Sequence, residues 1–259
     1  MDLGLAGCVA IVAGSSSGMG LAVARELNQE GCRVVMLARR ETVLRDAAAE
    51  IEQRTGIPTL AIAGDARDDA ALERAVTEAT SAFGGIDIVV NNTGGPPAGA
   101  ITSFDDDSWR EAHELTLMSS IRLTRHALPQ LRARGRGRVI HLTSSSVKEP
   151  DDGLGLSNSL RAAVTGWSKT LAREEARHGI TVNCVAPGYI DTERLKYLYS
   201  TGADPELARQ QDAQKIPVGR FGAPAEIGAA VAFLCSDRAA FINGITLLID
   251  GGLGRGLLS

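Results

Sequence analysis

Short apolar runs alternate with longer amphipathic segments along the whole chain. The runs are rich in Val and Ile, as expected of strands buried on both faces of a sheet. They begin at Cys8, Arg33, Thr59, Ile86, Arg138, Ile180 and Ile245. The amphipathic segments predict helices over 21–30, 41–53, 68–83, 109–131 and 157–177, with a helical pair before the last strand. This alternation is typical of βαβ units. We therefore expect one α/β domain over residues 1–259, a three-layer, doubly wound sheet of seven parallel strands with helices on both faces.

Composition and charge narrow the class of protein. The 259 residues are 44% hydrophobic and 22% charged, which is typical of a globular protein and not of a disordered one. The net charge of −4 gives no basic surface for nucleic acid. No apolar run approaches the roughly 18 to 20 residues that span a bilayer, and the first residues lack the basic region and cleavage site of a signal peptide. We expect a cytoplasmic protein that binds neither membrane nor nucleic acid.

The cysteines and histidines do not form a metal-binding pattern. The four cysteines are scattered and sit in or beside apolar runs, so we interpret them as buried reduced thiols. The four histidines show no paired spacing. We expect no metal site.

The first apolar run ends in a glycine-rich turn, "AGSSSGMG", from which a helix continues. Ligands of doubly wound sheets bind at the carboxyl ends of strands, where the strand order reverses. Gly14, Gly18 and Gly20 permit a tight turn, close approach of a diphosphate, and close helix packing, while the helix N-terminus offers free N–H groups. The turn predicts a dinucleotide site; the alternative is a glycine-rich turn that binds nothing. Segments 94–100 and 188–205 are long enough to be functional loops.

The second strand indicates which dinucleotide is bound. An acidic residue that would bind a ribose 2′-hydroxyl is absent, because Ala38 holds that place and Arg39 and Arg40 follow it. Guanidinium groups at this point suit a 2′-phosphate. NADP(H) is therefore favoured over NAD(H); the alternative is that both arginines are merely solvated at a helix start.

Five ordered motifs carry a resemblance to a known family. They are "AGSSSGMG", "NNTGG" at 91–95, "GRVIHLTSSS" at 137–146, "NCVAPGYIDT" at 183–192 and "INGITLLIDGG" at 242–252. Together they resemble the short-chain dehydrogenase/reductase family over nearly the whole chain, and within it the 3-oxoacyl-(acyl-carrier-protein) reductases. The resemblance implies a Rossmann fold and hydride transfer to or from a carbonyl or alcohol carbon.

The resemblance also assigns the cofactor site. Asp65 would bond the adenine amino group, Asn91 and Gly94 would line the adenine-ribose channel, and Pro187 to Thr192 would hold the nicotinamide end. Asp65 has an alternative role as the cap of the helix near Asp68. The full implied set is Gly14, Ser16, Ser17, Gly18, Met19, Arg39, Arg40, Asp65, Ala66, Asn91, Gly94, Thr143, Pro187, Gly188, Ile190 and Thr192.

The catalytic positions depart from the family pattern. Ser144 matches the serine that polarises the substrate carbonyl, but the tyrosine and lysine positions fall on Ser157 and Arg161, and the asparagine position falls on Thr116. Ser157 and Arg161 lie four residues apart and so share a helix face. Arginine binds ribose hydroxyls or an anion but does not exchange a proton at working pH, and serine is a poor acid.

The missing tyrosine leaves the proton donor open. The tyrosines of the chain, at 189, 197 and 199, all lie beyond this helix. Tyr189 and Lys148 are candidate donors, and the serines at 144–146 are an alternative that could hold water or an anion. His141 is expected to pack beneath the helices.

Two functions follow from this site. The first is an NADP(H)-dependent oxidoreductase that acts on a small carbonyl or alcohol substrate. This substrate could be anionic or bound to an acyl carrier. The alternative is a nucleotide-binding sensor or scaffold that has lost catalysis. The resemblance further implies a homotetramer, assembled through the fourth and fifth helices and the last strand, with a dimer as the alternative.

Overall fold

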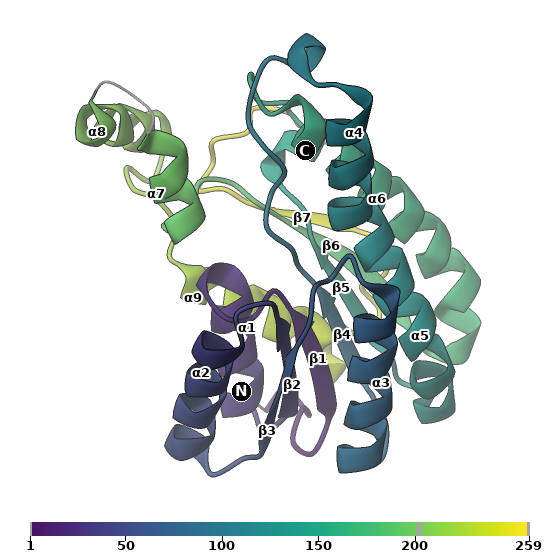
Figure 1. Ribbon diagram of the computed structural model, residues 1–259. Coiled ribbons are helices and arrows are strands. Elements are labelled where there is room, and N and C mark those ends of the chain that lie inside the picture. The colour runs from purple at the N-terminus through teal and green to yellow at the C-terminus, as the bar shows by residue number, and fades with distance from the viewer. Residues whose placement is uncertain (1, 201–203, 258–259) are drawn as a thin grey trace.

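A seven-stranded parallel sheet forms the centre of the computed structural model, which describes residues 2–200 and 204–257 (Figure 1). The strand order is β3-β2-β1-β4-β5-β6-β7, so the chain reverses its direction of travel across the sheet between β1 and β4. The strands are β1 (Val9–Ala13), β2 (Arg33–Ala38), β3 (Thr59–Ala63), β4 (Ile88–Asn91), β5 (Arg138–Leu142), β6 (Thr181–Pro187) and β7 (Thr246–Ile249). The predicted doubly wound sheet, with this number of strands, is confirmed.

Helices cover both faces of the sheet and make three layers. One face carries α1 (Gly18–Gln29), α2 (Glu41–Thr55) and α9 (Pro224–Cys235). The other carries α3 (Asp69–Phe83), α5 (Ser119–Arg134) and α6 (Gly155–Glu175). The remaining α-helices are α4 (Asp106–His113), which precedes α5, and α7 (Glu193–Tyr199) and α8 (Pro205–Lys215), which project beyond the carboxyl end of the sheet (Figure 1).

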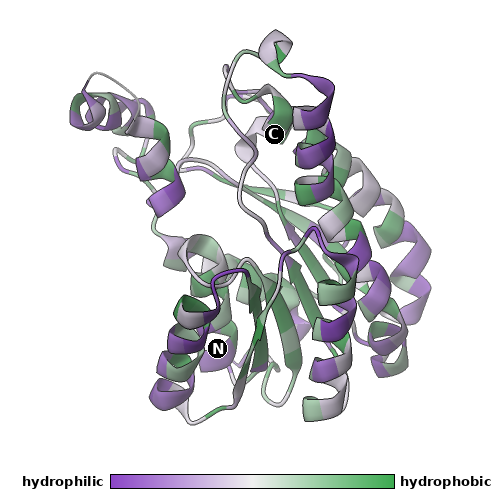
Figure 2. Ribbon diagram, viewed as in Figure 1, coloured by the Kyte–Doolittle hydropathy of each residue, from purple (hydrophilic) through white to green (hydrophobic). Residues whose placement is uncertain are grey.

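Apolar side chains fill the two spaces between the sheet and its helix layers. The inner strand β1 is buried along its whole length, which explains why its sequence is a continuous apolar run and does not alternate. Figure 2 shows the hydrophobic strands at the centre and polar positions on the outer sides of the helices. All four cysteines are free and buried, as predicted. The polar groups left for chemistry therefore gather where the strands end.

The structure corrects two details of the predicted elements. The single helix expected over 109–131 is interrupted by a π-helical turn, Glu114–Met118, between α4 and α5. The expected helical pair before β7 is three helices, because α7 lies inside the segment 188–205 that looked like a loop. Periodicity is a weak guide to a helix of seven residues. Residues 201–203 of that segment lie outside the described residues, and no helix in the described chain is long and apolar enough to cross a membrane.

Candidate active site

The N-terminus of α1 follows β1 and lies at the reversal point of the sheet, between β1 and β4. Helix α1 starts at Gly18, directly after the turn that follows β1. Its N-cap residue, Ser17, makes no side-chain cap hydrogen bond, so the first N–H groups of the helix are left for a ligand. A helix N-terminus with free N–H groups and positive potential suits a diphosphate.

Glycine is required at two points of this turn. Gly14 has φ +60°, and a Cβ atom there would lie 2.7 Å from the backbone oxygen of Asn92. A Cβ atom on Gly20 would run into the backbone oxygen of Gly14. The Asn92 side chain also donates to the oxygens of Ala13 and Gly14, at 3.4 and 3.2 Å. The end of β4 therefore holds the turn in the tight shape that the glycine spacing predicts.

The arginines after β2 are placed beside this turn. Arg39 and Arg40 are exposed, and Arg40 donates to the Ser17 hydroxyl at 3.3 Å. No carboxylate of the described residues lies within ion-pair distance of either guanidinium. Both charges are therefore available to a bound phosphate.

Asp65 does not cap the next helix. Asp68 is the N-cap of α3 and accepts from the Ala70 N–H at 3.0 Å, while Asp65 is paired with Arg67 at 2.8 Å. Hydrogen bonds from the Arg67 side chain hold the pKa of Asp65 below its usual range. The helix-cap alternative for Asp65 is therefore wrong, and an adenine contact would have to share this carboxylate with Arg67.

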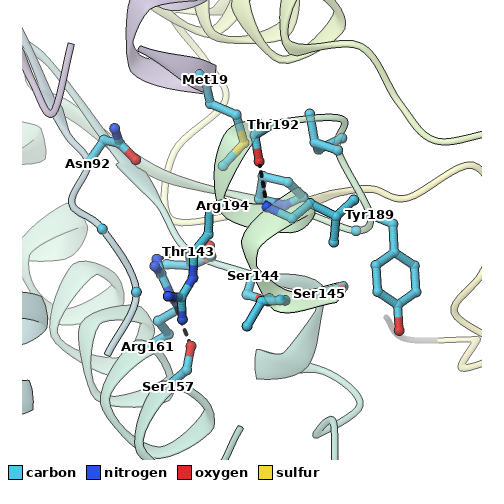
Figure 3. A pocket seen from close by; sticks show the side chains of 18 of the residues that line it. Met19, Asn92, Thr143, Ser144, Ser145, Ser157, Arg161, Tyr189, Thr192 and Arg194 are labelled. Carbon is cyan, nitrogen blue, oxygen red and sulfur yellow. Dashed lines mark hydrogen bonds between the residues drawn. The ribbon is translucent and has the colours of Figure 1, made fainter. Parts of the chain in front are cut away.

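One pocket at the carboxyl edge gathers most of the predicted site (Figure 3). The predicted residues that line it are Gly14, Ser17, Gly18, Met19, Gly94, Thr143, Ser144, Ser157, Arg161, Pro187, Gly188, Ile190 and Thr192. The predicted residues that do not line it are Ser16, Arg39, Arg40, Asp65, Ala66, Asn91 and Thr116. Apart from Asn91 and Thr116, the second group belongs to the implied diphosphate and adenosine end of the cofactor site.

Asn91 and Thr116 lie beneath the pocket. Asn91 is buried and donates to the Thr124 hydroxyl at 2.9 Å, whereas its neighbour Asn92 lines the pocket. Thr116 is buried in the π-helical turn, and its hydroxyl has no hydrogen-bond partner in the described chain. Neither side chain lines the pocket, and the roles that the resemblance implies for Asn91 and Thr116 remain predictions.

Ser157 and Arg161 do share one face of α6, as their spacing predicts. The Nε atom of Arg161 donates to the Ser157 hydroxyl at 3.2 Å. The Nη1 atom of Arg161 donates to the backbone oxygens of Leu142 and Thr143, at 2.9 and 3.1 Å. Arg161 therefore joins α6 to the end of β5, next to Ser144, whose own hydroxyl accepts from the Ser146 N–H at 3.2 Å.

A second arginine, Arg194, lines the same pocket and was not predicted. It extends from α7 and donates to the Pro96 oxygen at 2.8 Å, so it connects α7 with the loop after β4. Figure 3 shows Arg161 and Arg194 reaching into the same region. Burial, and next the charge of Arg194, lower the pKa of Arg161 to about 10. Sequence reasoning missed Arg194 because it treated α7 as loop.

The candidate proton donors differ in their position relative to the pocket. His141 is packed beneath the helices, as predicted, with its ring edge-on to Trp167 at 5.3 Å. Lys148 lies outside the lining of this pocket. Tyr189 lines it, but its ring points away from Ser157 and Arg161 (Figure 3). Asp151 was not considered from the sequence, and it also lines the pocket.

The environment of Asp151 favours its protonated form. The residue is partly buried, and burial, followed by the neighbouring charge of Asp152, raises the pKa of the Asp151 carboxyl. No ion pair to its carboxylate occurs within the described ranges. A carboxyl group can donate a proton, whereas arginine stays charged at working pH and serine is a poor acid.

Comparison with known proteins identifies the class. The family model described as enoyl-(acyl carrier protein) reductase matches residues 13–254. Dehydrogenase/reductase SDR family member 4 of Oryctolagus cuniculus is 36% identical over 253 residues, covering 96% of this chain and 94% of that protein. A 3-oxoacyl-[acyl-carrier-protein] reductase of Vibrio cholerae is 34% identical, covering 97% of this chain and 99% of that protein.

A solved structure agrees with this assignment. L-sorbose reductase of Gluconobacter frateurii, complexed with NADPH and L-sorbose, superposes with a TM-score of 0.95 at 36% identity, covering 99% of this chain and all of that one. The chain belongs to the short-chain dehydrogenase/reductase family, with the Rossmann-type fold of its relatives. These relatives are oxidoreductases, and L-sorbose reductase binds NADPH.

Buried His141 generates a prediction about acid stability. Burial lowers the pKa of His141 from 6.5 to about 3, so the folded protein keeps this ring neutral while the unfolded chain protonates it below pH 6.5. The unfolded state then binds more protons, and folding stability falls as the pH drops from 6.5 towards 3. By this linkage, His141 accounts for about 2 kcal/mol of stability lost between pH 7 and pH 5.

Urea unfolding at pH 7 and pH 5 tests this directly. We expect His141→Leu to show the smaller loss of unfolding free energy over this interval, whatever its stability at pH 7. Equal losses in the two proteins would show that His141 does not titrate on unfolding. His178→Leu, which changes a half-buried histidine outside the core, serves as the control.

Proposed function

We propose that this protein is an NADP(H)-dependent oxidoreductase that transfers hydride to or from the carbonyl or alcohol carbon of a small molecule. The observation that carries the proposal is the pocket that joins the free N-terminus of α1 to Ser144. A dinucleotide on the helix end would run along the carboxyl edge of the sheet towards Ser144. The bound NADP(H) would supply or accept the hydride.

The chain offers separate groups to each part of the cofactor. The free N–H groups of α1 suit the diphosphate, and Arg39 and Arg40 suit the 2′-phosphate. Pro187, Gly188, Ile190 and Thr192 line the pocket and would hold the nicotinamide end. Their backbone is fixed by β7, since the Gly188 N–H donates to the Ile249 oxygen at 2.9 Å.

The remaining polar groups of the pocket suit the substrate. Ser144 would orient the substrate oxygen through its hydroxyl, and Ser157 would complete the polar network through its bond with Arg161. We assign the role of proton donor to Asp151, because its side chain lines this pocket and is partly buried, and because the pKa of its carboxyl group is raised. Carboxyl groups are effective general acids when their pKa lies close to the working pH.

Cofactor choice follows from the two arginines beside the turn. We expect wild-type protein to bind NADPH more tightly than NADH. Arg39→Ala and Arg40→Ala should each weaken NADPH binding by about tenfold and leave NADH binding unchanged, because each removes a charge-assisted contact to the 2′-phosphate alone. Fluorescence titration of the reduced cofactors measures this, with Arg45→Ala, whose exposed side chain pairs with Glu41, as the control. Equal affinities of wild-type protein for the two cofactors would contradict the prediction.

Turnover tests the assigned roles. With NADPH and a panel of short ketones, aldehydes and oxo acids, we expect slow reduction by wild-type protein. Asp151→Asn should lower kcat on the order of a hundredfold, as for the loss of a general acid, with the NADPH affinity unchanged. Asp152→Asn, which changes the exposed neighbouring acid, should keep most of the activity. An equally large loss in both variants would remove Asp151 from the role of proton donor.

A restored variant separates an enzyme from a binding protein. Ser157→Tyr combined with Arg161→Lys would install the residues that the family resemblance implies at these positions. If the wild-type protein reduces no compound of the panel while this double variant does, the alternative function as a nucleotide-binding sensor or scaffold is favoured. Activity of the wild-type protein favours the oxidoreductase.

The assembly state is a separate expectation, supported by apolar surface near the last strand. Strand β7 forms one edge of the sheet and is only partly buried, and Phe233, Phe241 and Ile245 are exposed. We expect a homotetramer that covers this surface. Light scattering coupled to gel filtration should give four times the chain mass of 27.1 kDa; a monomer or a dimer would contradict it.

A further inference from the structure

Two guanidinium groups face the substrate side of the pocket without a counter-ion. Arg161 is fixed by backbone oxygens and by Ser157, and Arg194 by the Pro96 oxygen. Neither forms an ion pair with a carboxylate of residues 2–200 or 204–257. Arg194 lowers the pKa of Arg161, which places the two positive charges within each other's field. Both side chains are half-buried, and two like charges in one cavity repel each other.

The acidic residues of the pocket do not neutralise this pair. Glu193 is exposed and forms its ion pair with Lys196 at 2.8 Å. The pKa of Asp151 is raised first by burial and next by the charge of Asp152. Neither Arg161 nor Arg194 is among the causes of this shift. Burial is the main cause of the lowered pKa of Arg194, whose guanidinium lies over the neutral ring of Tyr197, 5.7 Å from its centroid. The positive charge therefore remains for a ligand to compensate.

The free donors of the pair match a planar anion. The Nη2 atom of Arg161 makes no hydrogen bond in the described chain, and Arg194 uses one Nη atom on Pro96. Hydrogen bonds from a guanidinium to a carboxylate are stronger than neutral ones, and Nη2 of Arg161 together with the nitrogens of Arg194 that do not bond Pro96 can hold one carboxylate between the two side chains. The backbone bonds of both arginines fix their positions before a ligand arrives, so little side-chain entropy is lost on binding.

The pair lies on the substrate side of Ser144 and not at the diphosphate end. The diphosphate has its own site at the N-terminus of α1, near Gly14 and Gly18. Arg161 is instead held by the oxygen of Thr143, the residue directly before Ser144. An anion on this guanidinium would therefore sit a short distance from a carbonyl oriented by Ser144.

We propose that Arg161 and Arg194 form a subsite for the carboxylate of a short oxo acid, or of the corresponding hydroxy acid, whose reacting carbonyl lies one or two bonds away at Ser144. This inference rests on the proposed function and narrows its substrate class. A thioester-linked acyl group carries no charge at that position, so the subsite favours a free acid over an acyl-carrier-bound substrate.

Calorimetry with acetoacetate and its neutral amide, acetoacetamide, tests the subsite. Both are titrated into protein saturated with NADP⁺ and into cofactor-free protein; ketone and NADP⁺ are both oxidised, so binding occurs without turnover. We expect acetoacetate to bind on the order of tenfold or more tightly than the amide. Arg194→Gln should remove this preference, and Arg110→Gln, an exposed arginine paired within α4, should retain it.

The same titrations distinguish the alternatives. Loss of NADP⁺ affinity in Arg194→Gln, with the preference for acetoacetate unchanged, would assign this arginine to the cofactor and overturn the subsite. Equal binding of acid and amide in both forms of the wild-type protein would also overturn it, while intact NADP⁺ binding would leave the proposed function standing. A preference for the acid that disappears in Arg194→Gln supports the subsite even if NADP⁺ fails to bind, in which case the proposed function alone fails.

Arg161 is tested with a conservative change, because its removal would leave the oxygens at the end of β5 unpaired. Arg161→Lys keeps the charge but loses the planar fork. We expect it to fold, to retain NADP⁺ binding and to lose most of the preference for acetoacetate. If both single variants, Arg161→Lys and Arg194→Gln, kept the full preference for acetoacetate over acetoacetamide, the subsite would be overturned.

Discussion

Parallel strand pairing is the constraint on which the rest of this structure depends. Because all seven strands are parallel, each ends at the same edge of the sheet, and the chain must cross one face of the sheet to begin the next strand. Both faces are then covered by helices, and the polar residues that follow β1, β4, β5 and β6 meet at one place. The reversal between β1 and β4 leaves room there for the N-terminus of α1.

The same constraint explains what the sequence could reveal. Strands buried on both faces are mainly apolar, so their positions could be predicted, and with them the sheet and about half of the pocket lining. The glycine turn was equally clear, because the close contacts of Gly14 and Gly20 exclude any side chain. These features depend on local residue type, which a single sequence records directly.

The features that were missed depend on how the chain is arranged in space. Asp65 was a plausible cap for α3 from its spacing, but the Ala70 N–H donates to Asp68, and Asp65 pairs with Arg67. Arg194 became part of the pocket because a short helix directs it towards Pro96, almost a hundred residues earlier in the chain. Asn91 and Asn92 are adjacent and chemically identical, but strand geometry points one into the core and the other towards the pocket.

The family resemblance places a tyrosine and a lysine at the positions of Ser157 and Arg161, and such a substitution would do more than remove a proton donor. A lysine would carry one flexible ammonium group, whereas the guanidinium of Arg161 bonds two backbone oxygens and a hydroxyl at once and stays fixed. A fixed charge next to Ser144, without an ion-pair partner among the described residues, would raise the affinity of the pocket for anions. It would also stabilise the negative charge that develops on a carbonyl oxygen as hydride arrives. The same substitution that weakens proton transfer can thus offset part of that loss electrostatically, provided that a group such as Asp151 delivers the proton.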